Sequence, residues 1–181
     1  MSKFSTIRIK ELLEKSDAAK LPDHKGAALE ELGRYLFGKM KGLELYAQNK
    51  FNKSGSRELD IIYKNDRRIS ELHFLDGFIP IECKNTAKKT TSEQVNWFAN
   101  KVSDTTARYG ILLSLSGVTG KDETEAAKSE ITRAVGKLGV GLLVLTRAEI
   151  LQLSSTCDLA DLLERKFHAL CLEEKIEFEF E

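Results

Sequence analysis

An acidic and a basic side chain lie two residues apart in the segment Phe78–Asn85, which reads FIPIECKN. Its apolar residues predict a strand. Because side chains alternate across a strand, Glu82 and Lys84 share one face, while apolar side chains point to the other. Lys and Glu are rarely buried in proteins unless they are paired or functional. A carboxylate beside an ammonium on a half-buried strand therefore indicates a site for chemistry.

A second carboxylate lies on the preceding apolar segment, Glu58–Ile62, which reads ELDII. Strand alternation places Leu59 and Ile61 on one face and Asp60 on the other. If this strand pairs with the next as a hairpin, Asp60 and Glu82 converge on one point. The alternative interpretation is an exposed edge hairpin with an ordinary cross-strand ion pair.

Two converging carboxylates repel each other unless a proton or a metal ion relieves the repulsion. Hard oxygen ligands suit Mg²⁺, which takes one or two carboxylates together with water and substrate phosphate; Mn²⁺ is the alternative cation. Lys84 is placed to orient or deprotonate a water molecule, or to hold a phosphate. Asp60, Glu82 and Lys84 together suffice for metal-assisted hydrolysis of a phosphodiester.

The elements that must position these residues follow from hydrophobic spacing. We expect strands at 43–49, 58–63, 78–84, 109–115 and 140–146, and helices at 6–16, 27–40, 92–108, 122–138, 147–153 and 159–171. LPDHKG, at 21–26, is expected to separate the first two helices. The order predicts one α/β domain over residues 1–181, in which a mixed central sheet of about five strands is flanked by helices on both faces.

The expected helix at 92–108 has its own apolar stripe. Val95, Phe98, Ala99 and Val102 recur at helical spacing and are predicted to face the core. Gln94, Trp97 and Lys101 are expected to fall on the opposite face.

The 181 residues hold 28 Lys or Arg and 28 Asp or Glu, so the formal net charge is zero. Neutrality excludes a protein that coats nucleic acid by bulk charge alone. The charges are nevertheless unevenly distributed, because residues 1–57 hold 12 basic and 7 acidic residues and residues 158–181 hold 3 basic and 8 acidic ones. The basic surplus precedes the Asp60 strand, where a phosphate backbone would approach.

Targeting signals and metal-binding cysteine patterns are missing from the sequence. The first ten residues are charged and lack the apolar stretch of a signal peptide, and no apolar run reaches the ~20 residues that span a bilayer. Cys83, Cys157 and Cys171 are widely separated and form no CxxC pair, which favours free thiols over a zinc or redox site. We expect a cytoplasmic protein with no membrane partner.

Asp60 followed by Glu82-x-Lys84 resembles the D…(E/D)xK signature of the PD-(D/E)xK nucleases, the restriction-endonuclease-like superfamily. More narrowly, the chain resembles the Mrr-like branch of this superfamily, since Gly26–Glu30 matches the G-x-x-apolar-E pattern of the first family helix. The similarity continues through Tyr109–Ser114 and Gly141–Leu153 and covers about residues 24–154. It implies a three-layer restriction-endonuclease-like fold.

The resemblance also implies roles for individual residues. Glu30, Asp60 and Glu82 would be the metal ligands, and Lys84 the water-orienting base or phosphate clamp. The adjacent Glu31 leaves open which of the two helix carboxylates faces the site. The residues expected to contact DNA are Lys53, Ser56, Arg57, Asn85, Lys88, Lys89 and Gln94.

The expected function is that of a Mg²⁺-dependent (or Mn²⁺-dependent) DNA endonuclease of the Mrr-like restriction type. Two alternatives stay open: a nuclease similar to Holliday-junction resolvases, and a catalytically silent module of the same fold that binds DNA or takes part in an assembly. A homodimer is plausible because two strands must be cut. A partner protein is another possible source of specificity.

Overall fold

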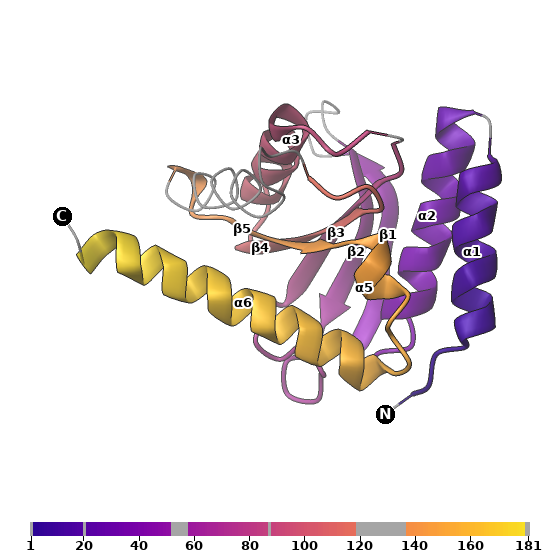
Figure 1. Ribbon diagram of the computed structural model, residues 1–181. Coiled ribbons are helices and arrows are strands. Elements are labelled where there is room, and N and C mark those ends of the chain that lie inside the picture. The colour runs from indigo at the N-terminus through magenta and orange to yellow at the C-terminus, as the bar shows by residue number, and fades with distance from the viewer. Residues whose placement is uncertain (1, 20, 52–57, 87, 119–136, 180–181) are drawn as a thin grey trace.

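The structure is a computed structural model that describes residues 2–19, 21–51, 58–86, 88–118 and 137–179. Helices and strands follow one another in an order that matches the expected α/β pattern (Figure 1). The elements are α1 (Thr6–Ala18), α2 (Pro22–Phe37), β1 (Leu43–Phe51), β2 (Glu58–Asn65), β3 (Phe78–Lys84), α3 (Ser92–Ser103), β4 (Tyr109–Ser114), β5 (Gly141–Leu145), α5 (Arg147–Ile150) and α6 (Thr156–Glu179).

The strands form a five-stranded mixed sheet in the order β1-β2-β3-β4-β5. The first three strands are antiparallel neighbours, whereas β3, β4 and β5 run parallel. Parallel neighbours require a crossover connection, which α3 supplies between β3 and β4. The predicted mixed sheet of about five strands is confirmed, and the candidate strand β3 lies at its centre.

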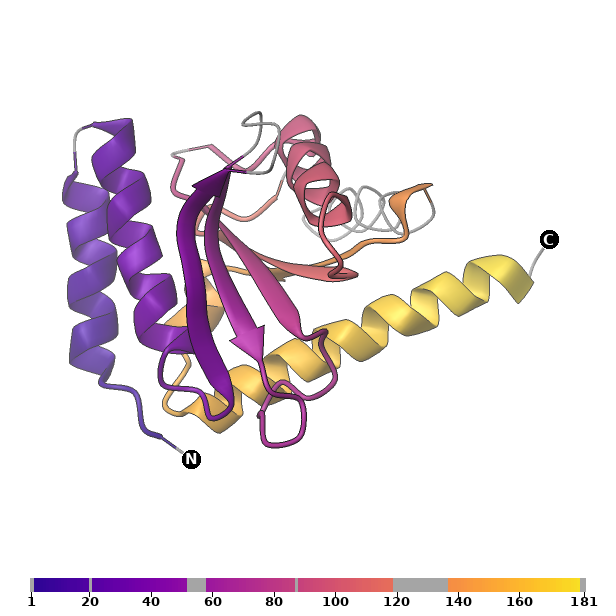
Figure 2. The ribbon, with the colours of Figure 1, turned by 180° about the vertical axis from the view of Figure 1, so that it is seen from behind.

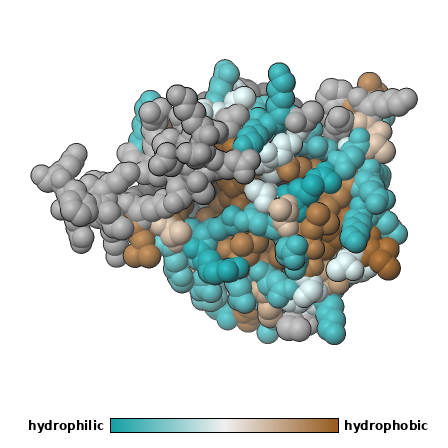
Figure 3. Space-filling model, in the orientation of Figure 1, coloured by the Kyte–Doolittle hydropathy of each residue, from teal (hydrophilic) through white to brown (hydrophobic). Residues whose placement is uncertain are grey.

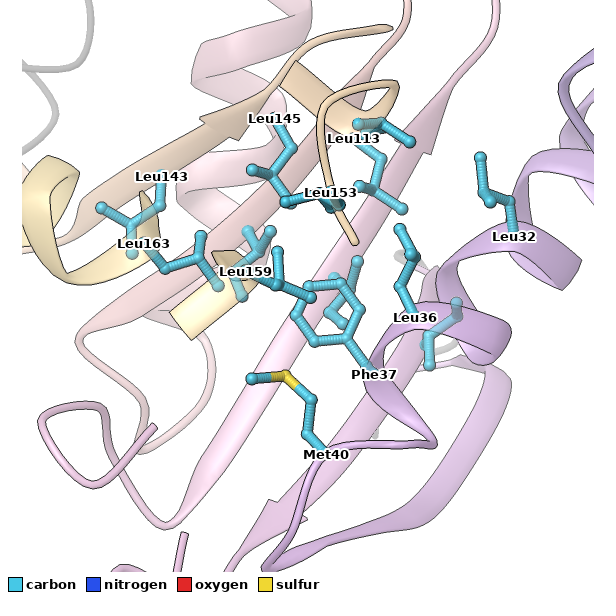
Figure 4. Packing of buried hydrophobic residues seen from close by; sticks show 14 of the residues in the cluster. Leu32, Leu36, Phe37, Met40, Leu113, Leu143, Leu145, Leu153, Leu159 and Leu163 are labelled. Atoms are coloured by element: carbon cyan, nitrogen blue, oxygen red, sulfur yellow. The ribbon is translucent and has the colours of Figure 1, made fainter. Parts of the chain in front are cut away.

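The larger hydrophobic core lies between the sheet and the helices α1, α2, α5 and α6. Figure 4 shows Leu36 and Phe37 of α2 beside Leu159 of α6, with Leu113 of β4 and Leu145 of β5 in the same cluster. Helix α1 lies along α2, as both ribbon views show (Figures 1 and 2). This layer fixes α2, and with it Glu30, against the sheet.

Helix α3 covers the opposite face and encloses a smaller core. The predicted stripe of α3 is confirmed, since Val95, Phe98, Ala99 and Val102 are fully buried. They pack with Leu112 of β4 and with residues of β5. The two layers of helices and the sheet between them make the three-layer fold that the sequence predicted.

Several element boundaries differ from the predicted ones. Helix α2 begins at Pro22, so LPDHKG does not separate the helices as expected. Proline is well tolerated in the first helical turn because its nitrogen has no hydrogen to leave unsatisfied. Helix α3 ends at Ser103 with Asp104 as its C-cap, five residues before the expected end. Most of the helix expected at 122–138 lies outside the described residues.

The last helix is longer than expected, because α6 spans Thr156–Glu179 instead of 159–171. Its first part packs into the larger core through Leu159 and Leu163, and its last turns extend away from the sheet (Figures 1 and 2). The face that carries α6 mixes hydrophilic with hydrophobic residues (Figure 3). In the described part of the chain, no helix has the length and apolar character needed to span a membrane.

The contact between α3 and β4 leaves no room for a side chain at Gly110. A Cβ there would lie 2.7 Å from Val102 Cγ2 and 2.8 Å from Phe98 Cζ. We expect Gly110→Ala to lower the free energy of unfolding by about 1–3 kcal/mol, the usual cost of overpacking a core. Urea unfolding, followed by the fluorescence of the single tryptophan, Trp97, measures it. Gly77→Ala, whose Cβ would meet nothing within 4 Å, is the control, and equal effects of both changes would contradict this packing.

Candidate active site

The register between β2 and β3 places Asp60 and Glu82 beside each other. Ile61 pairs with Ile81 and Ile62 with Pro80, so the next pair along the strands is Asp60 and Glu82. The Asp60 Oδ2 atom accepts a hydrogen bond of 2.7 Å from the backbone N–H of Cys83. The register and this hydrogen bond therefore bring the two acidic residues side by side on paired strands.

One detail of the alternation in β2 is wrong. Leu59 was expected to share a face with Ile61, but it packs in the smaller core on the α3 side, whereas Ile61 packs in the larger core. Strands twist along their length, and Leu59 lies at the start of β2, where strict alternation is least reliable. The position of Asp60 is unaffected.

Glu82 is fully buried and is held by two ammonium groups. Lys84 Nζ lies 2.8 Å from Glu82 Oε1. Lys101 Nζ donates hydrogen bonds of 2.8 Å to Oε1 and 2.7 Å to Oε2. A carboxylate that has lost its water is tolerated only when it is paired and hydrogen-bonded in this way.

Lys101 corrects a prediction from the sequence. It was expected on the helix face opposite Val95, Phe98 and Val102, but only 7% of it is exposed, and its ammonium reaches the sheet. At 100° per residue Lys101 lies about 60° from Phe98, at the margin of the apolar stripe. The long apolar stem of a lysine allows its charge to reach a partner from such a flanking position. The small angle between Lys101 and Phe98 was the one sign in the sequence that Lys101 could turn toward the core.

Burial and the neighbouring Glu82 carboxylate raise the pKa of Asp60 to about 7, against the hydrogen bond from Cys83 and the nearby lysines. Burial acts to lower the pKa of Lys84, but the carboxylates of Glu82 and Asp60 outweigh it and hold this pKa above its usual value. Lys84 is therefore a cation at neutral pH. Near neutral pH, Asp60 is a carboxyl group ready to exchange its proton for another cation.

Glu30 and Glu31 have different surroundings. Glu30 Oε2 accepts a 2.7 Å hydrogen bond from Gln48 Nε2 on β1, and Gln48 Oε1 accepts one of 2.7 Å from Arg34. Glu31 faces α1, where Arg8 and Lys15 bind it at 2.9 and 2.6 Å. Glu30 is thus the helix carboxylate on the sheet side, and Gln48 is a contact that the sequence reasoning missed.

The Cys83 thiol lies within electrostatic reach of all three acidic residues. Burial raises the pKa of its thiol, and Asp60, Glu30 and Glu82 raise it further. All three predicted acidic residues therefore act on this thiol. Among the described residues, however, no group of three or more His, Cys, Asp and Glu side chains is arranged to hold a metal ion. Asp60 and Glu82 are the pair brought together, and Glu30 stays a predicted ligand.

The residues expected to contact DNA lie in three kinds of place. Gln94 forms a capping box with Thr91 at the start of α3. Asn85 donates a 3.0 Å hydrogen bond to the backbone oxygen of Ser16, which ties the end of β3 to α1. Lys88 is exposed and Lys89 half-buried in the loop before α3, whereas the remaining ones lie outside the described residues: Lys53, Ser56 and Arg57.

The oxygen ligands of Asp60 and Glu82 fit a divalent cation such as Mg²⁺, which in proteins is often held by only one or two carboxylates. The two acids are adjacent, and one of them has a strongly raised pKa. A cation at this point would relieve the repulsion that now favours a proton on Asp60.

A three-layer fold with a mixed sheet, and with Asp60, Glu82 and Lys84 on its central strands, defines a restriction-endonuclease-like protein. Comparison with protein families agrees, because the model of the Mrr catalytic domain, a restriction endonuclease family, matches residues 23–147. The match covers more than half of the chain, which therefore belongs to this family of nucleases. A comparison with curated proteins gave no significant match.

The raised pKa of Asp60 predicts how stability depends on pH without metal. Between about pH 4, where the unfolded chain releases this proton, and pH 7, the folded protein binds more protons, so this contribution to stability falls as the pH rises. Asparagine cannot ionise, so Asp60→Asn should not lose this stability as the pH rises. Above pH 7 its free energy of unfolding should exceed that of the wild type by up to about 4 kcal/mol, at 1.36 kcal/mol per pKa unit.

Chemical unfolding in EDTA between pH 4 and 8 measures this difference, with Asp161→Asn on the exposed side of α6 as the control. The Asp60→Asn and wild-type stabilities should agree near pH 4 and separate above it. Stability curves that stay parallel over this range would contradict the assignment of the raised pKa to Asp60.

Proposed function

We propose that the protein is a DNA endonuclease of the Mrr restriction type that requires Mg²⁺ or Mn²⁺. The observation that carries this proposal is the pairing of Asp60 with Glu82 on adjacent strands, with Lys84 bound to Glu82 at 2.8 Å. Membership in the Mrr catalytic domain family supports the same conclusion.

Asp60 and Glu82 would hold the cation, with Glu30 as a further ligand. When bound, the cation would supply Lewis-acid stabilisation of the charge that develops on the phosphate. The protein's own contribution is to fix the two carboxylates on paired strands and to keep water away from Glu82, which is fully buried. A fixed acidic pair in a partly dry site is suited to one cation and its phosphate.

Lys84 would act as a donor to a phosphate oxygen or to the attacking water. Its raised pKa supports this role over that of a general base, because a lysine that keeps its proton at neutral pH does not accept another. Its side chain is 27% exposed, so the ammonium remains accessible from the protein surface.

The acidic pair also favours catalysis over a silent binding module. A module that only binds DNA gains nothing from carboxylates near the phosphates, because they repel the backbone. The proposed contacts to the backbone are Asn85, Lys88, Lys89 and Gln94, around the end of β3 and the start of α3, together with Lys53, Ser56 and Arg57 before β2. A homodimer and a partner protein stay predictions.

The first test is cleavage of supercoiled plasmid DNA with Mg²⁺ or Mn²⁺. Lys84→Ala and Asp60→Asn should fold normally and cut at least about 100-fold more slowly, the usual loss when one group that stabilises transition-state charge is removed. Lys64→Ala, which removes an exposed lysine from β2, should cut like the wild type. The same assay is repeated with unmethylated duplexes, methylated duplexes and four-way junctions, in order to find which kind of DNA is cut. Wild-type rates in Lys84→Ala would show that the site lies elsewhere.

Glu30 and Glu31 form a matched pair of variants on one helix. Glu30→Gln should slow cleavage by about tenfold or more, because it removes the negative charge of a proposed metal ligand. Glu31→Gln loses two partly exposed ion pairs to α1, which should cost about 0–1 kcal/mol of stability and no activity. Initial rates and melting temperatures of both variants distinguish them. Slower cleavage by Glu31→Gln alone would reverse the assignment.

A further inference from the structure

Lys101 neutralises the carboxylate that the proposed function assigns to the metal ion. Both oxygens of Glu82 accept a hydrogen bond from Lys101 Nζ, at 2.8 and 2.7 Å. Lys84 Nζ lies 2.8 Å from Glu82 Oε1. Both oxygens of Glu82 therefore already have a cationic hydrogen-bond partner.

We propose that Lys101 is a built-in counter-ion that competes with the divalent cation for Glu82, so that the cation binds tightly only together with a nucleic-acid phosphate. The inference rests on the proposed function, since it concerns the same site. Lys101 is here a positioning residue: it acts on Glu82 and is not assigned a contact with the substrate.

The charges around the site support this competition. Two ammonium groups lie against the single carboxylate of Glu82, and together they exceed its charge. A divalent cation added to this arrangement meets two positive charges within a few ångströms of its ligand, and like charges at that distance disfavour each other strongly at a buried site. A phosphate brings negative charge to the site and so offsets the positive charge that the divalent cation adds.

The burial of Lys101 makes it the stronger competitor. Its side chain is 7% exposed, whereas that of Lys84 is 27% exposed. Water screens the Lys84 pair more than the Lys101 pair. The α3 backbone that carries Lys101 is fixed by the capping box of Thr91 and Gln94 and by the buried Phe98, so the ammonium is held over Glu82.

Binding of Mn²⁺ to the DNA-free protein tests the proposal, with free Mn²⁺ measured by electron paramagnetic resonance. Lys101→Gln keeps a hydrogen-bond donor but removes the charge, and should bind Mn²⁺ about tenfold or more tightly than the wild type, in line with the effect of one close charge on an acidic site. Lys101→Arg keeps the charge and should bind like the wild type. The exposed lysine change Lys64→Gln is the matched control and should have no effect.

A folded Lys101→Gln protein that binds Mn²⁺ no more tightly than the wild type, or more weakly, overturns the proposal, because Lys101 would then support the metal site.

Circular dichroism and Trp97 fluorescence check folding. Removing one partner of a buried ion pair is strongly destabilising, so Lys101→Met is prepared as a second neutral variant. If neither variant folds, the ¹⁵N resonance of the Lys101 ammonium in the wild type decides: titration with Mg²⁺ should leave it unchanged without DNA and shift it with DNA, and the reverse overturns the proposal.

A second measurement adds a duplex with uncleavable phosphorothioate linkages. DNA should increase the Mn²⁺ affinity of the wild type about tenfold more than that of Lys101→Gln, because the variant has no ammonium to displace. Equal increases in the two proteins contradict the coupling. If the wild type neither binds nor cuts DNA, the proposed function fails, while the DNA-free comparison still decides the role of Lys101.

Discussion

Glu82 carries its charge at a fully buried position of the central sheet, where an isolated charge would cost on the order of several kcal/mol. The surrounding structure meets this constraint from two directions. Lys84 lies two residues further along the same strand, and Lys101 reaches across from α3. The Lys101 pair is buried on both sides and contacts both oxygens, so the arrangement of β3 and α3 around Glu82 is tied to the chemistry of one carboxylate.

The sheet supplies the second half of the site. The antiparallel pairing of β2 with β3 brings Asp60 beside Glu82, and burial together with the repulsion between the two acids raises the pKa of Asp60 to about 7. A pair of acids held this close is unfavourable for stability without a cation, which indicates that the arrangement serves a function. The larger core holds α2 on the other face, and Gln48 positions Glu30 on the sheet side of that helix.

The sequence predicted the mixed sheet, the apolar stripe of α3 and the pairing of Asp60 with Glu82, because strand alternation and helical spacing determine these features directly. It placed Lys101 on the wrong face, since a long side chain at the margin of a stripe chooses its direction from a tertiary partner. Helical periodicity alone did not decide whether Glu30 or Glu31 faces the site. Their ion pairs with α1 and their contacts with β1 separate them, and neither was visible along the chain.

The proposed chemistry needs a divalent cation and a phosphate to meet at Asp60 and Glu82. A crystal structure of the protein with Mn²⁺ and an uncleavable DNA duplex tests this most directly, because the anomalous scattering of manganese locates the ion independently of the refined model. We expect an anomalous peak within coordination distance of oxygens from both Asp60 and Glu82, with a DNA phosphate beside it. A manganese peak elsewhere, with DNA bound away from β2 and β3, would contradict the account.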